Sequence, residues 1–183
     1  MRAFRADNPG VSLRYQRFDY HQQPGYLVEQ RADLGVLCLP VPEDAGLTIV
    51  PLMTEPRQVV LAADHPLAGK ETLTFDDLRD LPTLEHRPDV AQVWTDFWRV
   101  SPRPDGRTPL GGPVANSMEA MLAEVATGRC VSFVAAHLPH TYPRPDIVAR
   151  EVEGLTPRTL GLGWLASNTN PALKDLVALA ERR

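Results

Sequence analysis

Short apolar runs alternate with segments of helical periodicity along this chain, and this alternation constrains its fold more than any other feature. A continuous apolar run is typical of a strand that is covered on both faces. Apolar residues at i, i+3, i+4 and i+7 are typical of a helix. Strands and helices in alternation predict an α/β fold with a largely parallel sheet. The runs expected to be strands are 11–15, 34–39, 47–50, 58–61, 83–85, 131–136, 147–152 and 160–165.

Proline, glycine and capping residues predict where the helices begin and end. Asn116 and Glu119 have the spacing of a capping box ahead of a helix that a glycine ends. Asp89 is the expected N-cap of a helix that carries Trp94 and Trp98, whose i, i+4 spacing favours packing along that helix. Further helices are expected before Pro9, over 24–30, over 75–79 and from Pro171 onward.

Composition is typical of a folded globular domain. Apolar residues make up 43% and charged residues 23% of the 183 residues. The formal net charge of −4 gives no basic excess, so the chain is not expected to bind nucleic acid by itself. The sequence shows neither a secretion signal nor an apolar run long enough to span a membrane, so the expected location is the cytoplasm. Cys38 and Cys130 lie in apolar runs and are expected to be free, buried thiols.

The chain lacks the motifs of common catalytic and cofactor-binding sites. Gly111-Gly112 has neither the spacing nor the lysine of a phosphate-binding loop. His137 and His140 are separated by Leu138-Pro139, which argues against the regular helical pair of a zinc site. Ser132 has no recognisable base near it in the sequence. We therefore expect no catalytic residue, no metal and no cofactor.

Several segments, taken in order, resemble the effector-binding module of LysR-type transcriptional regulators. Their order and spacing, over Phe4 to Leu179, carry the resemblance more than any single motif does. It implies a two-lobed α/β fold of the type II periplasmic-binding-protein kind. The matching segments are Phe4–Pro9 followed by Val11-Ser12-Leu13, Gln30–Val36, Leu47–Glu55, His65-Pro66-Leu67-Ala68 followed by Asp77-Leu78, and Met121–Val131.

The resemblance also implies a division into lobes and shows where the chain departs from the family. Lobe I is expected over 1–61 plus 151–183 and lobe II over 62–150, with the hinge passages near 62–64 and 150–152. The resemblance begins inside the family's first helix, so we expect the family's winged helix-turn-helix, linker helix and first strand to be absent from this chain. We expect a strand from a partner chain or a rearranged terminus in place of that first strand. Gln30 and Cys130 replace usual glycines, so the backbone at both is expected to avoid positive φ.

The implied effector site is a cleft between the lobes, at strand ends and helix N-termini. For most candidates a structural role is the open alternative: a turn, an ion pair, a helix cap or core packing. The candidates are Asp19, Tyr20 and His21 at the end of the first predicted strand, Glu85, His86 and Arg87 after a short strand, Asn116 and Ser117 at a helix start, and Phe133 and Val134 on an inner strand.

The resemblance implies a ligand-sensing module of a DNA-binding transcription regulator that performs no chemistry. Its expected partners are a small effector such as an organic acid and further copies of itself, as a dimer or tetramer. Contact with DNA would be made only through a domain absent here, and no membrane contact is expected. The alternatives are a free-standing solute-binding protein of the same fold and an enzyme on a related two-lobed fold.

Overall fold

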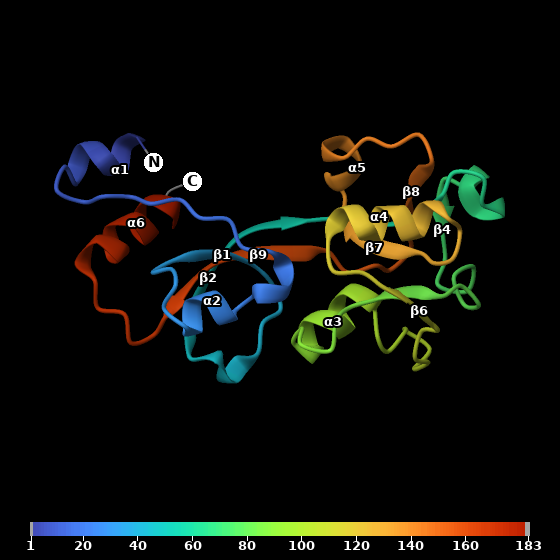
Figure 1. The fold of residues 1–183 in the computed structure, drawn as a ribbon, viewed down its shortest axis with the longest axis horizontal. Coiled ribbons are helices and arrows are strands. Elements are labelled where there is room, and N and C mark those ends of the chain that lie inside the picture. Colours follow the sequence, from blue (N-terminus) through green and yellow to red (C-terminus); the bar gives the residue numbers. More distant parts are fainter. Residues whose placement is uncertain (1, 182–183) are drawn as a thin grey trace. The chain divides into compact units, whose positions relative to one another are not determined.

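The computed structural model describes residues 2–181 and contains two compact units (Figure 1). Unit 1 consists of Met1–Met53 and Thr159–Arg183, and unit 2 consists of Thr54–Arg158. Each unit has its own sheet and its own apolar core.

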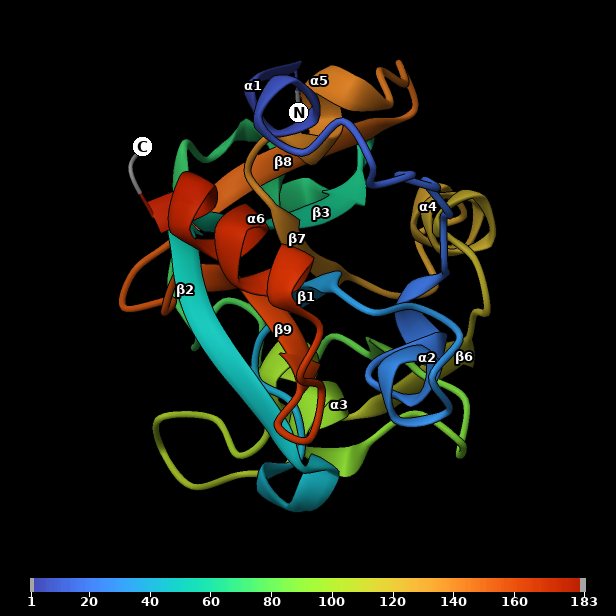
Figure 2. The same cartoon turned by 90° about the vertical axis from the view of Figure 1, so that its left-hand side faces the viewer.

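Unit 1 is built on a three-stranded sheet in the order β1-β9-β2, strands Gly35–Cys38, Arg158–Leu165 and Leu47–Glu55. β1 and β9 are antiparallel. Helix α6 (Pro171–Glu181) lies over β9 and β2 (Figure 2), where Leu173 and Val177 pack against Leu162. The remaining elements of this unit are α1 (Arg2–Asp7), α2 (Gly25–Val28) and the 3-10 helices Tyr20–Gln22 and Glu43–Ala45.

The strand predicted over 11–15 is wrong, because residues 11–19 form no regular element. A segment with alternating apolar residues forms a strand only when a partner strand lies beside it. At the outer edge of β1, side chains and not a strand make the hydrogen bonds. The Cys38 amide donates to the Gln23 side-chain oxygen over 2.8 Å, and the Tyr26 hydroxyl donates to the Val36 carbonyl over 3.4 Å. No strand among residues 2–181 pairs with this edge of β1, and a strand from a partner chain stays a prediction.

The backbone at Gln30 has a φ of +55°, so the prediction that it avoids positive φ is wrong. Gln30 follows α2, where the Arg31 amide donates to the Tyr26 carbonyl and the Gln30 amide to the Leu27 carbonyl. This pair of bonds is the left-handed helix end at which glycine is usual. Glutamine keeps the conformation there at a cost of about 1 kcal/mol. Cys130 is not among the residues with positive φ, as expected.

Unit 2 is built on a four-stranded sheet in the order β4-β8-β3-β7, strands Thr72–Leu73, Ile147–Val152, Arg57–Ala62 and Ser132–Ala135. A parallel pair, β5 (Thr83–Glu85) and β6 (Gly111–Val114), joins it through a parallel bridge between Thr83 and Val131. The helices are α3 (Gln92–Arg99), α4 (Met118–Ala126), α5 (Leu138–Thr141) and the 3-10 helix Pro66–Gly69.

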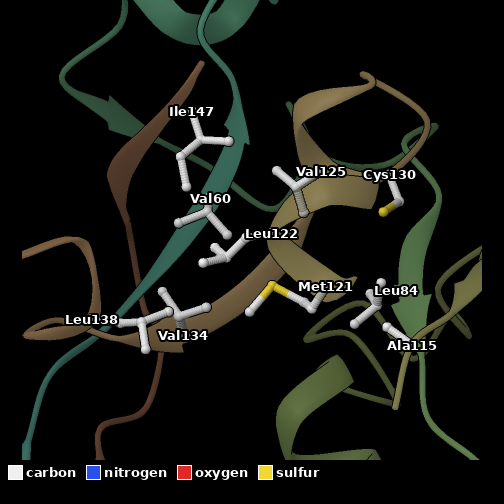
Figure 3. Packing of buried hydrophobic residues seen from close by; sticks show 10 residues of the cluster. All are labelled: Val60, Leu84, Ala115, Met121, Leu122, Val125, Cys130, Val134, Leu138 and Ile147. Carbon is white, nitrogen blue, oxygen red and sulfur yellow. The ribbon is translucent and has the colours of Figure 1, made fainter. Parts of the chain in front are cut away.

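Both faces of β3 are buried, which explains its unbroken apolar sequence. Val60 packs with Leu122 of α4 and Val134 of β7 on one face (Figure 3). Val59 and Leu61 pack on the other face with a second cluster. The strand predictions for 34–39, 58–61, 83–85, 131–136, 147–152 and 160–165 are confirmed to within two residues, and 47–50 is confirmed within the longer β2.

The predicted direction of the strands and the predicted hinge differ from the structure. β3 pairs antiparallel with both β7 and β8, and only β4–β8 and β5–β6 are parallel among the registers observed. The passages at 62–64 and 150–152 touch or enter this sheet, where Ala62 lies opposite Ile147. The units instead divide at Met53/Thr54 and Arg158/Thr159, because pairing with β7 and β4 holds β3 and β8 inside unit 2.

Helix starts in unit 2 lie later than predicted. Ala91, and not Asp89, is the N-cap of α3, because Asp89 binds the Arg87 guanidinium instead. Ser117, and not Asn116, is the N-cap of α4. Residues 75–79 form turns in place of a helix.

Candidate functional site

Two groups of predicted site residues meet at one end of the β5–β6 pair in unit 2. Parallel pairing sets Glu85 beside Val114, and the Ala115 amide donates to the Glu85 carbonyl over 3.2 Å. Both strands therefore end side by side, and residues 86–87 and 116–117 leave the sheet at the same edge. The carboxyl ends of parallel strands are where ligands of α/β proteins commonly bind.

Ser117 links this edge to α4. Its Oγ accepts a hydrogen bond from the Ala120 amide over 3.1 Å, so the capping role is confirmed. A serine hydroxyl also carries a proton, which this cap does not use and which a ligand oxygen could accept. Asn116 is exposed just ahead of it. The N-terminus of this nine-residue helix favours negative charge, so the arrangement suits an anionic ligand.

His86 and Arg87 differ in charge and in partners. Burial lowers the pKa of His86 to about 4, and the positive charge of Arg99 contributes to the shift, so the ring is neutral at pH 7. Its ring lies 5.0 Å from that of Trp94, edge to face. Arg87 is exposed and binds both carboxylate oxygens of Asp89, at 2.8 and 2.7 Å. Arg87 thus forms the ion pair that was the structural alternative for it. A ligand has to displace Asp89 from Arg87 or bind next to this ion pair.

Phe133 and Val134 on β7 are core residues. Each is 3% exposed, and they point into the two different clusters of unit 2. The alternative of core packing therefore holds for both, because neighbouring residues of a doubly covered strand face opposite buried layers.

Asp19, Tyr20 and His21 belong to unit 1. No strand precedes them within residues 2–18, so the prediction that they end a strand is wrong. The Asp19 amide donates to the Gln22 side chain over 2.9 Å at the start of the 3-10 helix, as an ordinary turn does. Asp19 is exposed and Tyr20 is half-buried. His21 lies in the same helix, and its side chain is outside the described part of the structure.

Buried arginines are the feature that sequence reasoning missed. Arg57 is 4% exposed and donates to the Thr156 carbonyl at 2.7 Å, the Phe97 carbonyl at 2.6 Å and the Thr156 hydroxyl at 2.8 Å. Its guanidinium also lies 3.8 Å from the centre of the Phe97 ring. The only signal in the sequence is an arginine directly ahead of an apolar run. Arg57 thus fixes the end of α3 to the chain just before β9.

A second missed group joins the two chain passages that border unit 2. Glu55 accepts two hydrogen bonds from Arg158, at 2.9 and 2.5 Å, and two from the amide and ring of His137, at 2.9 and 2.5 Å. The side chains of Glu55 and Arg158 are only 12% and 11% exposed. Burial raises the pKa of Glu55, but the bonds from Arg158 and His137 outweigh it and lower the pKa to about 2.

This carboxylate predicts a pH-dependent stability. A folded-state pKa of about 2, below the unfolded value of 4.5, stabilises the fold above about pH 4.5, and the gain is lost as the pH falls toward 2. We expect Glu55→Gln to cost on the order of 2 kcal/mol at pH 7. Urea unfolding should show a smaller difference from the wild type at pH 3. Glu153→Gln, at an exposed position, is the control, and an equal cost of Glu55→Gln at both pH values would contradict the assignment.

Possible metal ligands and thiols add no site to this arrangement within residues 2–181. Among the described residues, no group of three or more histidine, cysteine or acidic side chains is placed to hold a metal ion. Neither cysteine forms a disulfide within the described part of the chain. Cys130 is buried as expected, which raises the pKa of its thiol to about 11, whereas Cys38 is only half-buried. No helix within residues 2–181 is long and apolar enough to cross a membrane.

Known proteins share this fold over the whole chain. The chain is 24% identical over 187 residues to the HTH-type transcriptional regulator AlsR of Bacillus subtilis, covering 98% of this chain and 59% of AlsR. The effector-binding domain of QuiR in complex with shikimate matches at a TM-score of 0.77 with 18% identity, over 99% of this chain and 86% of that one. The regulatory domain of Synechocystis CcmR in complex with 2-PG matches at 0.74 with 18% identity, over 98% and 87%.

The assignment to a family rests on a match that extends over the full length of this chain. The chain spans about 60% of the length of AlsR, so it corresponds to one part of that regulator. The fold is that of LysR effector-binding domains, which is the type II periplasmic-binding-protein-like fold expected from the sequence. The family model of the LysR substrate binding domain matches residues 1–183, and the chain belongs to this family.

Proposed function

We propose that this chain senses a small organic acid on behalf of a LysR-type DNA-binding transcription regulator. The observation that carries the proposal is the meeting of Glu85, His86 and Arg87 with Asn116 and Ser117 at one strand end, beside the N-terminus of α4. An anionic group is the ligand that this helix start and Arg87 favour. Family membership and the ligand-bound QuiR domain support the proposal.

In this proposal the Asp19–His21 turn of unit 1 also contributes to effector binding. Binding then regulates through a higher affinity for one arrangement of the units than for another, since a ligand without that difference shifts no equilibrium. The arrangement would set the geometry of a homodimer or tetramer in the cytoplasm. DNA binding belongs to a domain outside this chain, and the chain itself performs no chemistry.

A panel of small carboxylates, with shikimate among them, tests the proposal. A ligand that binds only the folded protein raises its melting temperature, by mass action. We expect at least one carboxylate to do so, and its affinity is then measured by calorimetry. Turnover of that carboxylate by the purified chain would contradict the sensing role and favour the enzyme alternative.

Ser117→Asp separates capping from effector binding. Aspartate is as good an N-cap as serine, so the stability of unit 2 should be kept. Its negative charge would repel an anion at the α4 N-terminus, and we expect the affinity for the carboxylate to fall at least tenfold. Thr127→Asp, at the opposite end of α4, is the matched control and should leave the affinity unchanged. Unchanged affinity in Ser117→Asp would show that the site is assigned to the wrong place.

A further inference from the structure

Two arginines lie side by side against one face of β5. An Nη2 nitrogen of Arg103 donates to the Thr83 hydroxyl over 2.8 Å, and Nη2 of Arg99 lies 3.4 Å from a Glu85 carboxylate oxygen. Thr83 and Glu85 are two residues apart in a strand, so their side chains point to the same face. Both guanidiniums therefore reach that face, from the end of α3 and from the loop that follows it.

The Arg103 side chain is buried, the Arg99 side chain is mostly buried, and both are held by contacts. Arg103 is 7% exposed, and its guanidinium carbon lies 5.0 Å from the centre of the Phe133 ring and 5.6 Å from that of Phe75. The Arg99 side chain is 14% exposed. Thr83 is itself 1% exposed. A donor fixed by packing loses little freedom when it binds, so the pair is prepared to receive a ligand.

The carboxylates at this face do not balance the two positive guanidinium groups. Glu85 is the only carboxylate within 4 Å of either guanidinium among the described residues, and it contacts Arg99 only. Asp105, which attracts Arg103 from farther away, is bound to Arg107 at 2.9 Å. Burial lowers the pKa of Arg103 to about 10, and the positive charge of Arg99 adds to this lowering while Asp105 opposes it.

Two of the buried donors have no acceptor in the described chain. They are Nη1 of Arg103 and Nε of Arg99. A buried donor without a partner is costly, and more so when it is charged, so such a group indicates an ion or a water. An excess of positive charge favours the ion. The planar donor fork of arginine matches carboxylate and phosphate oxygens.

We infer that Arg99 and Arg103 form a binding site for a small oxyanion, a carboxylate or phosphate group, on this face of β5. All its residues lie in unit 2, and it goes beyond the effector proposal because it uses neither Ser117 nor Arg87. The anion completes the buried hydrogen bonds and neutralises the second guanidinium, so it stabilises unit 2.

Melting curves of the whole chain test this site, with acetate, phosphate or chloride as the probe at constant ionic strength. We expect a saturable rise in melting temperature with acetate or phosphate and a smaller one with chloride. In Arg103→Gln the apparent dissociation constant should increase about tenfold or more, as expected for a lost charged hydrogen bond. Arg129→Gln, at a side chain that is 62% exposed and belongs to neither site, is the control and should respond like the wild type. An equal rise with all three anions would overturn the inference.

Two further measurements keep the inference independent of the other results. Should Arg103→Gln fail to fold, phosphate binding to the wild-type chain, followed by phosphorus NMR line width and compared with Arg99→Gln, decides the question, and absence of binding to the wild type overturns it. Ser117→Asp should keep its response to phosphate while it loses the carboxylate effector. Failure of the effector proposal is thereby distinguishable from failure of this site.

Discussion

Arg57→Met is expected to lower the free energy of unfolding of unit 2 by about 3–5 kcal/mol. The substitution keeps part of the buried stem but removes three donated hydrogen bonds. The carbonyl and the hydroxyl of Thr156 lose this donor, and the Phe97 carbonyl keeps only the Val100 amide. Each such buried group costs about 1–3 kcal/mol, and loss of the contact with Phe97 adds to this. The expected result is a large shift of the urea midpoint, followed by the fluorescence of Trp94 and Trp98, which lie in unit 2.

Arg129→Met is the matched control for this experiment. Arg129 is 62% exposed and pairs with Glu124 at the surface, where an ion pair contributes about 0–1 kcal/mol. Its midpoint should stay close to that of the wild type. Similar midpoints for the two variants would show that Arg57 is not the cross-link that its hydrogen bonds suggest.

Leu122→Ala is expected to cost about 2–5 kcal/mol, the range for removal of a buried leucine side chain. Leu122 is 2% exposed and lies between α4 and the strands of unit 2, close to Val60 and Val134 (Figure 3). Calorimetric melting should show a lower transition temperature for unit 2. Leu110→Ala makes the same chemical change at a position that is 50% exposed, and its melting temperature should change little. A cost below 1 kcal/mol for Leu122→Ala would mean that the core around α4 is loosely packed.

The strands of unit 2 could be predicted from the sequence because a strand that is buried on both faces consists of consecutive apolar residues. β3 and β7 read as apolar runs since each contacts two cores. The strand predicted over 11–15 shows the limit of this reasoning. The alternation there indicates which side chains would point inward if the segment were a strand. A strand also needs hydrogen bonds from a neighbouring strand, and the local sequence does not specify that neighbour.

The boundary between the units could not be predicted for a similar reason. β3 and β8 belong to unit 2 because of antiparallel pairing between segments far apart in the chain, where Val60 lies opposite Ala149. Strand direction and partner choice are properties of the whole sheet. The prediction from sequence assumed parallel strands joined by helices, and it therefore placed the hinge inside the sheet of unit 2.

The candidate site was predictable where it follows chain topology and unpredictable where it depends on buried charge. Ends of predicted strands and a predicted helix start led to Glu85 and Ser117, and pairing of β5 with β6 brings them to one edge. Arg103 lies in a proline-rich loop whose sequence is typical of exposed segments. Its burial results from contacts with Thr83, Phe75 and Phe133, none of which is near it in the sequence.

The side chains along the outer edge of β1 have a consequence for self-association. Exposed strand edges recruit further strands and lead to aggregation. Gln23 and Tyr26 already occupy one donor and one acceptor of this edge, and burial raises the pKa of Tyr26 to about 12, so its hydroxyl stays a donor at any physiological pH. An intruding strand would have to break both bonds first. The strand of a partner chain that is predicted for this place would therefore bind less tightly than at a bare edge.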